Sequence, residues 1–299
     1  MSIKTQTKRQ GFMYFWLCSA ENNRNGVCKL FLHLCMKTKE SGMKAKDASA
    51  VLAQRIRDDF ARIAAQNGEE KKRVLQSFFK TGKGEYGEGD LFYGVTVPQT
   101  RALAKQYRKA LEQDGGAVLE GLMCDAYHEC RLLALLVLVQ QMEKADDAQA
   151  QSVYRFYMEH AAYINNWDLV DLSAPQVVGA FLLRRKDWKI LKEYAKSSHL
   201  WTQRIAIVST FAFIKAGDTK PVYTVADLLL QHPHDLIQKA TGWMLREAGK
   251  RVSQDEEIRY LTQRRKASEQ ARCRLMPRTM LRYAIERFDS AKRAEFMRA

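Results

Sequence analysis

Helical periodicity runs through most of this sequence and restricts its fold more than any other feature. Apolar residues recur every three or four positions in one segment after another, which is the spacing of a single face of an α-helix. The 299 residues include only 5 Pro and 16 Gly, and runs of β-branched residues that could form strands are few. We therefore expect an all-α protein.

The expected helices follow one another with short connections, apart from a glycine-rich loop at residues 82–90. Pairs of helices recur about every 35 to 45 residues, which is typical of HEAT-like repeats. This rhythm favours an α-α superhelix, or solenoid, over a compact bundle, and a solenoid offers a long concave face to an extended ligand. The expected helices lie at residues 47–66, 70–81, 98–111, 117–123, 127–143, 147–164, 167–185, 188–197, 199–216, 221–231, 235–251, 254–266 and 271–288.

The beginning of the chain differs from the rest, and a clean helical sequence opens at Met43. We expect residues 1–42 to be an N-terminal extension, either a disordered tail or an over-extended start, and residues 43–299 to form a single HEAT-like repeat domain. Residues 11–19 faintly resemble a signal peptide, but their apolar core is short and the sequence that follows is a poor cleavage region. No apolar run approaches the length of a membrane span.

A surplus of positive charge points to a polyanionic partner. The net charge is +15, which favours nucleic acid first and an anionic membrane surface second. The six cysteines form no C-x-x-C pair and no zinc-ligand spacing, so we expect no metal site and a reducing, cytoplasmic location. The glycine motifs of nucleotide-binding and serine-hydrolase sites are absent, which leaves phosphoryl and hydride transfer without support.

One stretch, N-N-W-D-L-V-D at residues 165–171, combines residue types suited to a cationic ligand. In a helix Trp167 and Asp171 lie one turn apart on one face, where an indole ring and a carboxylate can both attract a cation. Asn166 is a plausible N-cap, and Asp168 would complement the helix dipole. Taken alone, the stretch fits a packed Trp and a helix start better than chemistry. Asp171, however, has no such structural role.

A second stripe lies on the expected helix 235–251. Lys239, Trp243, Arg246 and Lys250 fall at i, i+4, i+7 and i+11, which places three cations and an indole on one face. Such a stripe is either a solvated face with a stray Trp or a phosphate-binding ridge with an aromatic platform. Gly242 weakens a helix relative to Ala, so we expect close approach of another helix or of a ligand there.

Arg204 enters an otherwise apolar helical pattern at residues 199–216. Its side chain could snorkel to the surface or pair with a nearby acid. It could equally clamp a phosphate or keep Asp171 ionised. The sequence by itself leaves these alternatives open.

Six short motifs occur in order along the chain. Together they resemble the AlkD-type DNA alkylation repair family over roughly Asp47 to Phe288, and six ordered motifs form a specific signal. The motifs are F-Y-G-V-T-V-P-Q-T-R (92–101), Y-H-E-C-R-L-L-A-L (127–135), N-N-W-D-L-V-D (165–171), L-W-T-Q-R-I-A-I-V (200–208), K-A-T-G-W-M-L-R-E-A-G-K-R (239–251) and M-P-R-T-M-L-R-Y-A-I-E-R-F (276–288).

The resemblance implies a HEAT-like superhelix that excises cationic N3- and N7-alkylated purines from double-stranded DNA without cutting the strand and without needing to flip the base. It implies that Asp171 is the catalytic carboxylate, that Trp167 and Trp243 flank the deoxyribose and backbone of the lesion, and that Arg204 contacts the DNA nearby. No metal or other cofactor is implied, and action as a monomer is the simplest expectation. Thr96 departs from members that carry Gln at that place, so we assign it no role.

The implied chemistry agrees with the residue types. Alkylation makes the purine a cationic leaving group, and its departure develops positive charge on the sugar, which a fixed carboxylate and electron-rich rings can stabilise. Two other functions stay open: a HEAT-repeat module that binds DNA through Lys239, Arg246 and Lys250 without chemistry, and a scaffold that binds an acidic protein. A carboxylate such as Asp171 facing phosphates weakens simple DNA binding and counts against the first of these.

Overall fold

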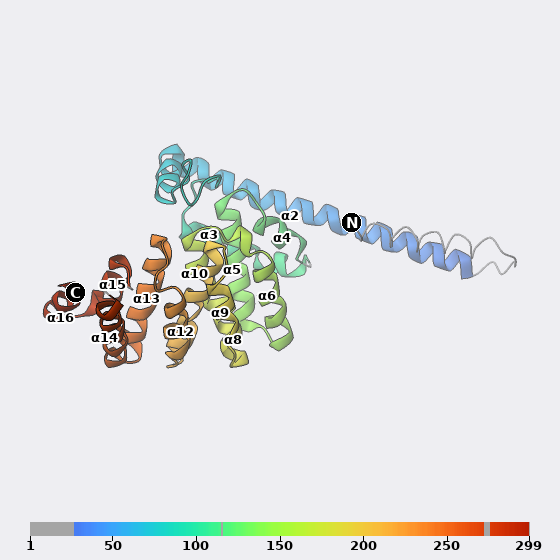
Figure 1. Cartoon of the computed structure of the whole chain (residues 1–299). Coiled ribbons are helices and arrows are strands. Elements are labelled where there is room, and N and C mark those ends of the chain that lie inside the picture. Colours follow the sequence, from blue (N-terminus) through green and yellow to red (C-terminus); the bar gives the residue numbers. More distant parts are fainter. Residues whose placement is uncertain (1–26, 115, 272–275, 299) are drawn as a thin grey trace. The chain divides into compact units, whose positions relative to one another are not determined.

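The computed structural model describes residues 27–114, 116–271 and 276–298, and these are built from helices and their connections (Figure 1). The expected all-α class is confirmed for this part of the chain. The α-helices are α2 (Val27–Phe78), α3 (Val97–Gln113), α4 (Ala117–Met123), α5 (His128–Lys144), α6 (Asp147–Glu159), α7 (Trp167–Ser173), α8 (Ala180–Arg185), α9 (Ile190–Ala195), α10 (Leu200–Ser209), α11 (Phe211–Lys215), α12 (Lys220–Leu228), α13 (Asp235–Arg251), α14 (Gln254–Ala271), α15 (Arg278–Ala284) and α16 (Ser290–Arg298).

The helix expected at 167–185 is divided into three pieces. A π-helical turn, η2 (Pro175–Gly179), separates α7 from α8. Pro175 has no backbone N–H to continue the ladder of hydrogen bonds, and Gly179 donates instead to the carbonyl of Ala174 at 2.9 Å. A Cβ at Gly179 would lie 2.4 Å from the carbonyl oxygen of Ser209, so the turn also lets α10 approach closely. The sequence pattern missed this break because apolar residues continue across it.

The C-terminal helices also differ from expectation. The helix expected at 271–288 is α15 followed by a 3-10 turn, η3 (Ile285–Arg287), and its residues 272–275 lie outside the described part of the chain. Pro277 stands at the N-cap of α15, where its fixed φ suits the start of a helix. We did not expect α16, whose amphipathic pattern is weak.

Each helix packs mainly on its neighbours along the chain. α5 contacts α3, α4, α6 and α7, α10 contacts α7, α9 and α13, and α13 contacts α14 and α15. α5 is central, as its composition predicts, because every residue from His128 to Leu138 is buried. Packing between successive elements is what helical repeats require, and it brings α7, α10 and α13 together around one site.

The chain divides into two units, Met1–Val51 and Leu52–Ala299. The expectation for residues 1–42 falls largely on residues 1–26, which lie outside the described part, while residues 27–51 belong to α2. The predicted boundary between an extension and a domain at residue 43 therefore stays a prediction. Among the described residues, none of the helices combines the length and the apolar character that crossing a membrane requires.

Candidate functional site

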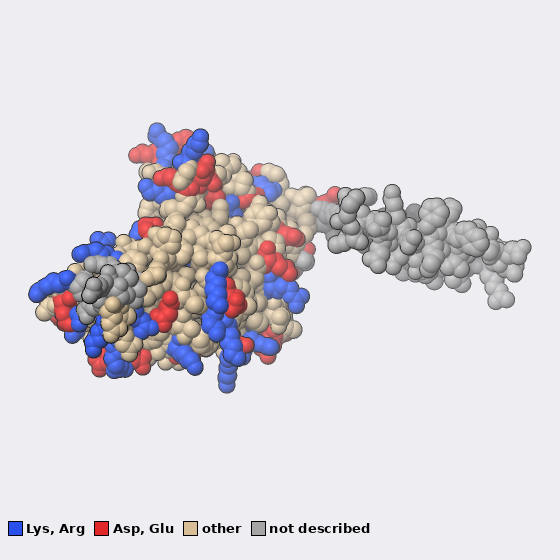
Figure 2. All heavy atoms as spheres, in the orientation of Figure 1, with Lys and Arg blue, Asp and Glu red and all other residues tan. Residues whose placement is uncertain are grey.

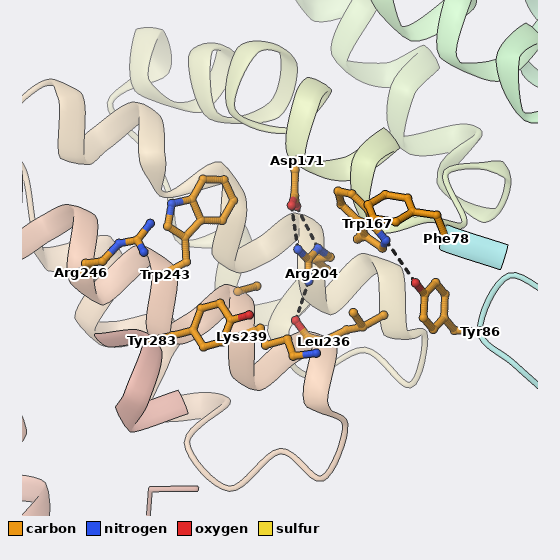
Figure 3. A pocket seen from close by; sticks show the side chains of 11 residues that line it. Phe78, Tyr86, Trp167, Asp171, Arg204, Leu236, Lys239, Trp243, Arg246 and Tyr283 are labelled. Atoms are coloured by element: carbon orange, nitrogen blue, oxygen red, sulfur yellow. Dashed lines mark hydrogen bonds and ion pairs between the residues drawn. The ribbon is translucent and has the colours of Figure 1, made fainter. Parts of the chain in front are cut away.

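The stretch at residues 165–171 starts helix α7 as expected. Asn166 is the N-cap, and its Oδ1 accepts a hydrogen bond of 2.8 Å from the backbone N–H of Trp167. Trp167 and Asp171 then lie one turn apart, and both face a pocket of about 500 Å³ in the Leu52–Ala299 unit. Figure 3 shows Asp171 between Trp167 and Trp243. The lining residues are Phe78, Tyr86, Trp167, Asp171, Arg204, Leu236, Lys239, Ala240, Trp243, Arg246 and Tyr283.

Arg204 is the partner of Asp171. Its Nε and Nη2 donate to the two carboxylate oxygens of Asp171 at 2.9 and 2.7 Å, and its Nη1 donates to the carbonyl of Leu236 at 2.5 Å. Of the alternatives left open by the sequence, this geometry matches pairing with the acid, since all three nitrogens are bonded within the protein. A planar guanidinium that meets both oxygens also fixes the direction of the carboxylate.

The environment of Asp171 combines two opposed effects. Burial raises the pKa of this carboxyl above its ordinary value, and the Arg204 guanidinium acts against that rise. The negative charge of Asp168 on the same helix adds a further raising effect. The site therefore holds a carboxylate that binds a proton more readily than a surface Asp and yet has a charged partner, which suits general-base work.

Trp167 is held by aromatic neighbours that the sequence analysis did not select. Its indole Nε1 donates to the hydroxyl of Tyr86 at 3.2 Å, and its ring meets Phe78 edge to face at 5.6 Å. Phe79 stacks on the same indole at 5.4 Å. The one signal available in the sequence was composition, since Tyr86 is an isolated aromatic in a glycine-rich loop. The structure adds that Phe78 is 59% exposed although apolar.

The stripe on α13 reaches the pocket in part. Lys239, Trp243 and Arg246 line it, whereas Lys250 is exposed and lies outside the lining. Lys239 pairs with Asp235 at 2.6 Å, and Arg246 pairs with Glu286. The first three residues of the stripe therefore share the pocket, and the sequence did not reveal the acidic partners of Lys239 and Arg246.

Gly242 allows the close helix contact that its position predicts. A Cβ there would lie 2.3 Å from the carbonyl oxygen of Met280 and 2.6 Å from Cβ of Tyr283. The partner is therefore helix α15, and this contact brings Tyr283 to the pocket. Thr96, to which we assigned no role, caps α3 through a capping box with Gln99 and does not line the pocket.

The surplus of basic residues is not one continuous patch on the face drawn in Figure 2, where Lys and Arg side chains are interspersed with Asp and Glu. The pocket concentrates a different set of groups: one carboxylate, aromatic rings from several helices, and the cations of α13. Such a set can accept a flat cationic group against the rings and an anion beside Lys239 and Arg246. Among the described residues, His, Cys, Asp and Glu side chains form no cluster of three that could hold a metal ion.

Comparison with known proteins places most of this chain in a family. A model of the family described as DNA alkylation repair enzyme matches residues 60–288. The chain belongs to this family. The resemblance seen in the sequence motifs is thereby confirmed, and the family points to a role in DNA repair and to DNA as the ligand.

Structural comparison agrees. A protein described as a predicted DNA alkylation repair enzyme from Enterococcus faecalis is similar over 74% of this chain and 96% of its own, with a TM-score of 0.58 and 14% sequence identity. At that identity the likeness supports the all-α helical repeat fold and nothing finer. No curated protein matches the sequence.

Proposed function

We propose that the protein is a monofunctional DNA glycosylase that removes cationic alkylated purines, such as 7-methylguanine and 3-methyladenine, from double-stranded DNA. The observation that carries the proposal is the placement of the Asp171 carboxylate among Trp167, Trp243 and the cations of α13 in one pocket. A cationic base and its sugar find electron-rich rings and a fixed negative charge there, and backbone phosphates find Lys239 and Arg246. Trp167 and Trp243 are substrate-binding residues in this proposal, and Arg204 belongs to the substrate site through its double contact with Asp171.

The reaction needs little acid catalysis because the leaving group is already positively charged. As the bond between C1′ and the purine nitrogen breaks, its electron pair neutralises the base and positive charge develops on the sugar. The carboxylate of Asp171 stabilises that charge and accepts a proton from the water that attacks C1′. Arg204 keeps the carboxylate oriented, and the products are the free base and an abasic site.

Release of free base from methylated duplex DNA by the purified protein tests the proposal. We expect Asp171→Asn to lower the single-turnover rate by about 100-fold or more, because the fixed charge and the proton acceptor are both lost. Asp187→Asn is the matched control, since Asp187 is exposed and lies outside the pocket. Equal release by wild type and Asp171→Asn would refute the assigned role of Asp171.

The same assay separates the enzyme from the other two candidates. A DNA-binding module would bind duplex DNA and release no base, and a scaffold for an acidic protein would fail to bind DNA at low salt. We also propose that the protein acts as a monomer and is located in the cytoplasm. Gel filtration of the protein with a short duplex checks the first of these.

A further inference from the structure

A buried charged cluster lies between helix α5 and the start of α7, next to the pocket but outside its lining. We call it the α5–α7 cluster, and it consists of Asp90, His128, Arg131 and Asp168. The ring of His128 lies between two carboxylates: Nε2 is 2.9 Å from Oδ2 of Asp168, and Nδ1 is 3.4 Å from Oδ2 of Asp90. Arg131 pairs with Oδ1 of Asp90 at 2.8 Å. The His128 side chain is only 2% exposed, so water does not screen these contacts.

This geometry favours a doubly protonated imidazole. A neutral ring carries one N–H, so its second nitrogen would direct a lone pair at a carboxylate. With His128 protonated, two positive and two negative charges balance inside the protein, whereas a neutral ring leaves a net buried negative charge. Burial alone lowers the pKa of His128, but Asp168 and Asp90 outweigh it and raise the pKa to about 9.

The cluster connects to the pocket along two routes. Asp168 follows Trp167 directly in the first turn of α7, and Asp171 lies one turn further along the same helix. The ring of Phe79 lies tilted against the His128 ring at 4.9 Å and stacks on Trp167 at 5.4 Å. His128 is therefore joined to Trp167 both through the helix and through an aromatic ring.

Asp168 depends on His128. Its Oδ2 bonds to the imidazole, while its buried Oδ1 has no hydrogen-bond partner among the described residues. The sequence predicts only a helix-start role for Asp168. The residue does lie in the first turn of α7, but it also makes this buried contact with His128. Without the charge of His128, the carboxylate of Asp168 would stand unpaired one turn from Asp171.

We propose that His128 is a positioning residue of the glycosylase site: its imidazolium holds the start of α7 in place and cancels the charge of Asp168, so that Asp171 keeps its working protonation state. The inference rests on the proposed function for its kinetic test. His128 does not line the pocket, and although it lies in the motif at residues 127–135, the sequence predicts no role for it in the site. It acts through Asp168 and Phe79 and does not touch the substrate.

The test uses the opposite charges of the two partners. His128→Gln removes a positive charge and Asp168→Asn removes a negative one, although both variants break the same contact. We expect the acid limb of the pH–rate profile for base release to move to higher pH in His128→Gln and to lower pH in Asp168→Asn, by roughly half to one pH unit. A merely structural role would lower the rate in both variants without moving the limb in opposite directions. The other groups that act on or face Asp171 are Arg204 of α10, Tyr157 of α6, and Lys239 and Arg246 of α13, and all are unchanged in both variants.

His160→Gln is the matched control. It removes a different imidazole, which is partly buried at the end of α6 and whose Nδ1 bonds the carbonyl of Phe156. His160 belongs neither to the cluster nor to the pocket. Its acid limb should coincide with that of wild type. Circular dichroism establishes that each variant is folded, and if His128→Gln is not, His128→Asn takes its place: an upward shift supports the inference, and an unchanged or downward limb overturns it.

A measurement that does not need activity keeps the two proposals distinct. Carboxyl carbon NMR titration of the full chain, with Asp171 assigned from Asp171→Asn, follows the pKa of Asp171 in wild type, His128→Gln and Asp168→Asn. Opposite shifts support the role of His128, and shifts that are absent or share a direction overturn it. If wild type releases no base, the proposed function fails, and this titration still decides the inference about His128.

Discussion

Helices α7 and α13 contribute charged residues to the same pocket, but they hold those charges differently. On α7 the charges are paired in places that water hardly reaches: the side chain of Arg204 beside Asp171 is 6% exposed, and that of His128 beside Asp168 is 2% exposed. On α13 the pair of Lys239 and Asp235 is open to solvent, with side chains 37% and 57% exposed. Arg246 is intermediate: it is 17% exposed and lies 3.5 Å from the buried Glu247, but its other partner, Glu286, is 51% exposed.

The contrast indicates that α7 and α13 have different roles in the site. A buried pair that loses one partner leaves an uncompensated charge, which costs several kcal/mol, so the α7 pairs are fixed parts of the structure. Pairs with an exposed partner contribute about 0 to 1 kcal/mol, so Lys239 can exchange Asp235, and Arg246 can exchange Glu286, for a phosphate at little cost. We infer that α7 determines protonation and geometry, while α13 supplies adjustable affinity for DNA.

The largest predicted effect is a loss of stability of the protein at alkaline pH, and its absence would contradict the contrast between α7 and α13. Because the pKa of His128 is raised from 6.5 to about 9, the native state holds this proton more tightly than the unfolded chain. The resulting stabilisation, roughly 3 kcal/mol, is complete below pH 6.5 and is lost as the pH rises through about 9. Urea unfolding at a series of pH values measures it.

His128→Gln supplies the reference for that measurement. Glu257, whose pKa burial raises to about 8, also favours the protonated native state and changes stability in the same direction over a lower range of pH. The difference between wild type and His128→Gln therefore isolates the contribution of His128. If the two proteins lose stability in parallel above pH 6.5, the buried imidazolium has been assigned wrongly.

A second prediction concerns the face of α13 that is turned away from solvent. Gly242→Ala should destabilise the protein by about 1 to 3 kcal/mol, because the new Cβ meets the backbone of α15. Gly121→Ala in α4 is the control: a Cβ there meets nothing within 4 Å, and the helix should gain about 0.5 to 1 kcal/mol. Equal stability of the two variants in thermal unfolding would show that the α13–α15 contact can shift to accommodate a Cβ without measurable cost.

Affinity for DNA should respond to α13 with a smaller effect and no change in pH dependence. Lys239→Ala and Arg246→Ala should each reduce the slope of log K against log salt by about 0.9, the value of one phosphate contact. Fluorescence anisotropy with an undamaged duplex gives the slope, and Lys189→Ala at an exposed position outside the pocket serves as control. Should either variant also move the acid limb of base release, the proposed division between α7 and α13 would be incorrect.

The smallest effect is expected at Lys250. The sequence stripe groups it with Lys239 and Arg246, but in the structure it lies outside the pocket lining. We expect Lys250→Ala to weaken duplex binding less than either of the other two variants in the same anisotropy assay. A loss as large as that of Arg246→Ala would mean that bound DNA extends along α13 beyond the pocket.

Much of the site was readable from local patterns. Helical spacing placed Trp167 and Asp171 on one face, Asn166 was recognisable as a cap, and Gly242 marked a close contact. The first two follow from interactions among residues a few positions apart, and the third follows because a glycine, which has no side chain, lets another helix approach closely. The break at Pro175 was not predicted, because the apolar pattern continues through η2 and only the backbone hydrogen-bond ladder changes there.

The sequence by itself determined the all-α class, the order of most helices and which side chains share a face, but not the break at η2 or the helix α16. Only the tertiary structure decided which charges meet. Arg204 reaches Asp171 across 33 positions, His128 reaches Asp168 across 40, and Tyr86 reaches Trp167 across 81. The physical reason is that helical periodicity is set by backbone hydrogen bonds four residues apart, whereas the partner and protonation state of a buried charge depend on which distant helix excludes water from it.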